Sequence, residues 1–153
     1  MQKLSGQLNE IEGLIKKCDA RNERISAVSV GWQLTHALKT IIKITQALES
    51  STPSNYKKQF SVWRLMFMTL GWFPRGKARA PKVVRPTDDE ITVESLHQTL
   101  EKTRAMVSQL SSLAEDAYFP HPYFKDMRKN AAIRFLEIHT NHHLKIARDI
   151  CKG

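Results

Sequence analysis

The residues most able to do chemistry are histidines near the end of the chain. Three of the six histidines, His139, His142 and His143, lie within five positions. In a helix, residues four apart lie one turn apart on the same face, so His139 and His143 can point at a common atom. The pair can be two ligands of one metal ion, or two core histidines that bond to neighbouring groups. The spacing alone favours neither.

The residues around this pair predict that both histidines are buried. Together with His139 and His143, several apolar residues follow the spacing of one helical face, namely Ala132, Phe135, Leu136, Ile146 and Ile150. The two histidines therefore replace apolar residues in a buried seam, and His142 lies at its edge. A buried imidazole needs partners for both ring nitrogens, or a metal.

Helical spacing of apolar residues recurs in four segments, at about residues 2–20, 30–47, 92–116 and 127–151. Residues 51–90 form a long, irregular arm that is rich in proline and glycine and contains one possible short helix, at 60–68. Four helices with short links predict an all-α fold, a four-helix bundle that forms a single domain over residues 1–153. Ser26 or Ser29 is the expected N-cap of the second helix, and Thr87 begins a capping-box pattern.

The other histidines give weaker signals. At 100° per residue, His36 lies about 130° from the centre of the apolar face of its helix, beside Trp32. Periodicity alone therefore indicates a flank residue. His97 follows the apolar Leu96 and is expected at the surface. His121 lies in a turn with two prolines at residues 119–124, where it could line a pocket or pack the turn.

The charge of the chain is concentrated in one segment. Residues 56–86 contain eight of the 24 basic residues and no acid, whereas the other 16 basic residues face 15 acids. This basic arm 56–86, with its interleaved aromatic residues, could bind nucleic acid or another polyanion. We favour the alternative, in which its aromatic side chains pack on the helices and its lysines are solvated.

The composition of the chain gives no sign of a membrane protein or of an exported one. No apolar run approaches the roughly 18 residues of a membrane span, and no signal peptide is evident. Only two cysteines occur, Cys18 and Cys151, and we expect both to be reduced. The expectation is a cytoplasmic protein with no membrane partner and no nucleic acid partner.

Three segments carry a resemblance to a known family. Residues 29–36 (Ser-Val-Gly-Trp-Gln-Leu-Thr-His) resemble the start of the second helix of DinB-like proteins, and residues 139–143 (His-Thr-Asn-His-His) resemble the motif of their last helix. Residues 121–124 (His-Pro-Tyr-Phe) resemble the His-Pro-x-Phe element of one DinB-like subfamily of unknown function. The likeness extends over about residues 26–150. It implies an up-down-down-up bundle with a divalent ion, zinc or nickel, held by His36, His139 and His143.

The resemblance also implies a class of chemistry. Three imidazoles leave a coordination position open for water or substrate, as in catalytic zinc sites. Some DinB-like proteins are thiol S-transferases and others are regarded as metal-dependent hydrolases, so a small-molecule or thiol substrate is implied. No catalytic residue is identified, since Glu137 is expected on the far side of its helix and solvated. A homodimer that holds metal without activity is the remaining alternative.

Overall fold

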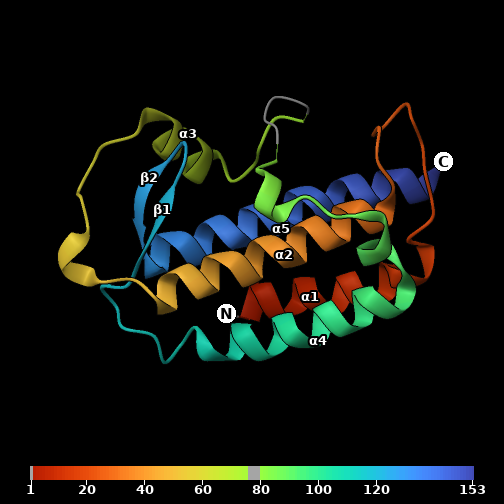
Figure 1. The fold of residues 1–153 in the computed structure, drawn as a ribbon. Helices are drawn as coiled ribbons and strands as arrows, with labels where there is room; N and C mark the ends of the chain where they lie inside the picture. The colour runs from red at the N-terminus through yellow and green to blue at the C-terminus, as the bar shows by residue number, and fades with distance from the viewer. Residues whose placement is uncertain (1, 76–79) are drawn as a thin grey trace.

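The computed structural model of the chain describes residues 2–75 and 80–153. This part of the chain contains five α-helices and one two-stranded sheet (Figure 1). The helices are α1 (Gln2–Leu14), α2 (Val30–Glu49), α3 (Val62–Leu70), α4 (Val93–Gln109) and α5 (Lys129–Lys152). The strands are β1 (Tyr118–His121) and β2 (Lys125–Arg128). Four short 3₁₀ turns are η1 (Ile15–Lys17), η2 (Pro53–Asn55), η3 (Lys82–Val84) and η4 (Asp88–Ile91).

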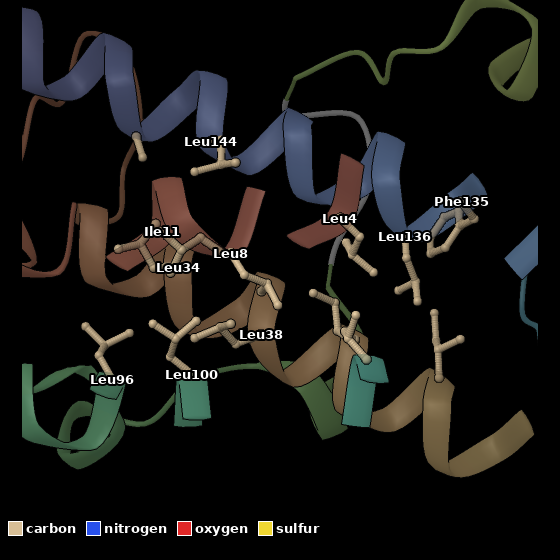
Figure 2. Packing of buried hydrophobic residues seen from close by; sticks show 14 of the residues in the cluster. Leu4, Leu8, Ile11, Leu34, Leu38, Leu96, Leu100, Phe135, Leu136 and Leu144 are labelled. Carbon is tan, nitrogen blue, oxygen red and sulfur yellow. The ribbon is translucent and has the colours of Figure 1, made fainter. Parts of the chain in front are cut away.

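The four longer helices run side by side around one core (Figure 1). Both α1 and α2 contact α4 and α5. Fully buried leucines and isoleucines spaced three or four apart line the inner face of each helix, as Figure 2 shows for Leu4, Leu8, Ile11, Leu34, Leu38, Leu96, Leu100, Leu136 and Leu144. This spacing gives each helix one continuous apolar face, and burying these faces together is the main driving force for the fold.

Side-chain caps fix where two of these helices begin. The Ser29 hydroxyl accepts a hydrogen bond from the Trp32 amide at the start of α2, as one of the two predicted caps. Thr92 does the same for the Ser95 amide at the start of α4. The predicted capping box at Thr87 is also present, but it begins the 3₁₀ turn η4 rather than an α-helix.

The prediction of an all-α, up-down-down-up four-helix bundle is wrong, because residues 118–128 form an antiparallel hairpin. Strand β1 pairs with β2 from Tyr118 opposite Arg128 to His121 opposite Lys125. The prolines at 120 and 122 predicted only a turn, but a two-stranded sheet tolerates proline, since neither strand is central. The His121 ring closes the hairpin, because its Nδ1 accepts hydrogen bonds from the amides of Tyr123 and Phe124.

The segment predicted as an irregular arm contains a helix, and it is attached to the rest of the protein by hydrogen bonds. Helix α3 begins at the Ser61 cap and ends at Gly71, whose φ of 69° is readily adopted only by glycine. The Arg64 guanidinium donates hydrogen bonds to the carbonyls of Phe124 and Asp126, which attaches α3 to the hairpin. The turns η3 and η4 contact α2.

The structure bears on the expectations about membrane spans and cysteines only in the following two respects. None of the helices in the described residues combines the length and apolar character that crossing a membrane requires. Cys18 is buried and Cys151 partly buried, and both are free thiols.

Candidate metal centre

Three histidines from two helices meet in the interior of the protein. His36 comes from α2, and His139 and His143 come from α5. One nitrogen of each ring lies within 4.8 Å of the corresponding nitrogens of the other two. Nε2 of His139 is 3.2 Å from Nε2 of His143, as expected for residues one helical turn apart. Among residues 2–75 and 80–153, no other group of histidines, cysteines or carboxylates has the spacing of a metal site.

The flank position that periodicity predicted for His36 is wrong. The side chain is only 4% exposed. Helix α2 contacts α4 and α5 and is also covered by η3 and η4, so it is buried well beyond its apolar face. The Trp32 indole stacks on the His36 ring with centroids 5.0 Å apart. A search for one apolar face misses such a helix, because its second contact surface contains Trp32, Gln33 and His36 rather than leucines.

The hydrogen bond of His36 fixes which of its nitrogens is free. Nδ1 lies 2.9 Å from the carbonyl oxygen of Val84, in η3. A carbonyl oxygen can only accept, so Nδ1 carries the proton and Nε2 presents a lone pair. The basic arm thus supplies a backbone group that orients one of the three rings.

The ring of His143 is oriented by a side chain, that of Gln33. Its Nδ1 lies 2.6 Å from Oε1 of Gln33, and the Gln33 amide nitrogen donates to the Ser26 hydroxyl at 3.1 Å. The bond to Ser26 sets the orientation of the amide, so the oxygen faces the imidazole. The proton of His143 is therefore on Nδ1, and Nε2 again presents a lone pair.

Neither neutral tautomer of His139 gives every polar atom of the cluster a hydrogen-bond partner. Its Nδ1 is buried and has no hydrogen-bond partner. With the proton on Nδ1, a buried donor is unpaired and two Nε2 lone pairs face each other; with the proton on Nε2, Nδ1 is a buried acceptor without a donor. A cation bound by the three Nε2 atoms removes the lone-pair repulsion, so these residues fit a metal ion.

Burial keeps these imidazoles uncharged. It lowers the pKa of His36, and it lowers the pKa of His139 and His143 well below the usual range for histidine. The positive charge that each neighbouring ring would carry lowers the pKa of the buried pair further. All three rings are therefore neutral near pH 7, the state in which an imidazole binds a metal.

The remaining histidines lie outside this cluster. His97 is exposed on α4, as predicted. His121 packs in the hairpin, where its ring stacks on Phe124 with centroids 4.4 Å apart and burial lowers its pKa to about 4. His142 is partly exposed next to His143; burial, followed by the charge of Arg75, lowers its pKa to about 4.

A cavity of about 230 Å³ adjoins the centre. Its lining includes Trp72, Phe73, Arg75, Asn141, His142 and Lys145. The Phe73 ring contacts both His139 and His142, with centroid distances of 6.5 and 6.1 Å. Phe73 therefore lines the cavity and also contacts His139, one of the three clustered histidines.

Sequence reasoning missed the groups that orient the cluster. Gln33 carried a usable signal, because it is a polar residue one turn before His36 near the start of a largely apolar helix. Val84 acts through its backbone, so its residue type gives no signal. Glu137 was expected to be solvated, but its side chain is only 14% exposed and pairs with Arg134.

Searches of protein-family models, curated protein sequences and solved structures gave no match to this chain. What the site can do is therefore argued from its geometry: a buried cluster of His36, His139 and His143 that could hold a metal ion.

Proposed function

We propose that the chain is a metal-dependent enzyme of the DinB-like superfamily, which binds one zinc or nickel ion through Nε2 of His36, His139 and His143. The observation that carries the proposal is that the two nitrogens of a ring have different roles: one is hydrogen-bonded and the other is free to bind metal. The Nδ1 atoms of His36 and His143 are bound by Val84 and Gln33, so the Nε2 atoms are the ones that converge. In metal sites, a ligating histidine characteristically donates its other ring N–H to such a carbonyl or amide oxygen.

The donor set favours a particular class of ion and chemistry. Imidazole nitrogens suit zinc and nickel better than magnesium or calcium, which prefer oxygen. A divalent ion with three imidazole ligands and an open position supplies Lewis acidity toward water or a thiol. Trp32 and Phe73 pack against His36 and His139 and limit the access of water to the cluster. Together these features support an S-transferase or a hydrolase.

The alternative function, polyanion binding by the basic arm, has less support. Three of its arginines already donate hydrogen bonds inside the chain, Arg64 to the hairpin, Arg75 to Asp149 and Arg85 to Ala80. These guanidinium groups are therefore less available to an external polyanion.

Metal content tests the proposed centre. Protein purified without a histidine tag should hold close to one equivalent of zinc or nickel per chain, measured by plasma mass spectrometry after dialysis. His36→Ala and His139→Ala should lose the metal, whereas His97→Ala, which removes an exposed histidine from α4, should retain it. Equal metal content in all three variants would overturn the assignment of the ligands.

Activity tests the reaction class. Metal-loaded protein is assayed for thiol transfer, with glutathione and an aryl halide, and for hydrolysis of p-nitrophenyl esters. We expect one of the two reactions to exceed the rate of the His139→Ala variant by at least about 100-fold, the scale expected for loss of an essential catalytic ion. Full metal occupancy without turnover in either assay would support the binding function and contradict these two reactions.

A further inference from the structure

The cavity beside the metal centre is formed by α5 and the segment that follows α3. Asn141, His142 and Lys145 contribute from α5, and Trp72, Phe73 and Arg75 contribute from the other wall. Asn141 and Lys145 are four residues apart and so lie on one face of the helix, next to the face that carries His139 and His143. The same helix therefore positions both the cavity and two of the proposed ligands.

The lining of the cavity has an excess of positive charge. Arg75 and Lys145 are both part of it, and none of the described residues that line it is acidic. Arg75 pairs with Asp149 at 2.6 Å, so their charges largely compensate. Lys145 is exposed and forms no salt bridge with any residue of 2–75 or 80–153. The ammonium group of Lys145 is therefore available to bind a negatively charged group.

The rest of the lining suits a small organic molecule. Trp72 and Phe73 offer flat apolar surfaces, and the Asn141 amide offers both a donor and an acceptor. A volume of about 230 Å³ accepts a compound smaller than a typical drug. The cavity therefore combines an ammonium group, an amide and aromatic walls, which together match a compact anion with an apolar part.

The contacts of Phe73 and His142 connect this cavity to the histidines. The Phe73 ring packs on His139, and the His142 ring lies 5.1 Å from the His143 ring, centroid to centroid. We infer that the cavity binds the carboxylate or phosphate of a small anionic substrate at Lys145, and that the remainder of the substrate extends past Phe73 toward the three histidines. This inference rests on the proposed metal centre for its reaction, but the anion site itself can be measured without metal.

The experiment measures binding of phenyl phosphate and of benzoate by calorimetry, with phenol and benzyl alcohol as neutral counterparts. Zinc-loaded and metal-free protein are both titrated, since a phosphate could also bind the ion. We expect the anionic compounds to bind both forms, and Lys145→Met to weaken them about 5- to 10-fold, the scale of one partly exposed charge-assisted hydrogen bond. Lys102→Met, which removes an exposed lysine from α4, should change nothing.

The outcomes separate this inference from the metal proposal. Equal affinity of Lys145→Met and wild type, equal affinity for neutral and anionic compounds, or binding that depends wholly on zinc would each overturn the anion site. Anion binding that Lys145→Met weakens, in a protein that takes up no metal, would overturn the metal centre and leave the anion site established. Because Lys145 is exposed, an unchanged thermal melt should confirm that the variant is folded.

Discussion

The ring of His143 is oriented by a single side-chain acceptor, the amide oxygen of Gln33. Gln33→Leu has nearly the same size but removes that acceptor, so Nδ1 of His143 becomes a buried donor without a partner. The ring can then adopt the other tautomer, which protonates the nitrogen that would bind metal. We expect zinc affinity to fall about 10- to 100-fold, as is typical for loss of such a supporting group.

A competition titration with a chromophoric chelator measures this loss of affinity. Gln46→Leu is the matched control, because it makes the same change at an exposed position of α2. Unchanged zinc affinity in Gln33→Leu would show that the position of His143 does not depend on the amide.

The spacing of residues predicted part of this cluster but not all of it. His139 and His143 are four apart in one continuous helical pattern, so their common face follows from α-helix geometry. That His36 joins them depends on which side of α2 meets α5, and a single apolar face does not determine this. The resemblance of residues 29–36 to a family motif supplied that prediction, and periodicity opposed it.

At the scale of elements, the helices were predictable and the hairpin was not. The predicted ranges 30–47 and 127–151 correspond to α2 and α5, because long apolar repeats fix the type of an element. The hairpin has strands of four residues each, and its register depends on contacts with distant segments. One is the hydrogen bond that the Lys57 amide donates to Asp126, 69 residues along the chain. Such contacts leave no local pattern in the sequence.

The hairpin should make stability depend on pH. Burial lowers the pKa of His121 to about 4, whereas an unfolded chain binds the proton near pH 6.5. Between these values the unfolded chain holds a proton that the folded hairpin excludes, so the free energy of unfolding decreases as pH falls from 6.5 toward 4. The stability associated with a neutral, buried His121 is therefore fully present above pH 6.5.

Urea denaturation at pH 7 and pH 5, with chelator present throughout, tests this dependence. His121→Asn keeps an acceptor for the amides of Tyr123 and Phe124 but does not titrate. Its loss of stability between the two pH values should be smaller than that of wild type, by roughly 2 kcal/mol. Identical losses would show that His121 takes up its proton in the folded hairpin.

Close packing at the start of α2 gives a second prediction for an element. A Cβ added at Gly31 would lie 2.4 Å from Cγ2 of Ile91 and 3.0 Å from Cβ and the carbonyl oxygen of Cys18. Gly31→Ala should therefore lower the free energy of unfolding by about 1–3 kcal/mol, measured by urea denaturation. Gly6→Ala adds the same methyl group inside α1 with nothing within 4 Å, and should stabilise by about 0.5–1 kcal/mol through helix propensity. A stabilised Gly31→Ala would mean that η4 does not approach α2 this closely.

For the molecule as a whole, the histidine cluster connects helices that are far apart in sequence. α2 and α5 come from opposite halves of the chain and pack against each other, with His36 on one and His139 and His143 on the other. The segment that contains Val84 covers the same cluster. A metal ion there would join α2 to α5 at one point, so metal binding and folding should be thermodynamically linked.

Zinc should therefore raise the melting temperature in proportion to the logarithm of its free concentration. At about 1,000 times the dissociation constant, the gain in unfolding free energy is roughly 4 kcal/mol if the unfolded chain binds no zinc. Differential scanning calorimetry across a series of buffered zinc concentrations measures the shift, and a chelator should reverse it. His36→Ala and His143→Ala should lose the dependence, because each leaves only two of the three ligands, whereas His97→Ala should keep it. If His36→Ala responds to zinc as wild type does, the stabilising ion binds at a place that does not join α2 to α5.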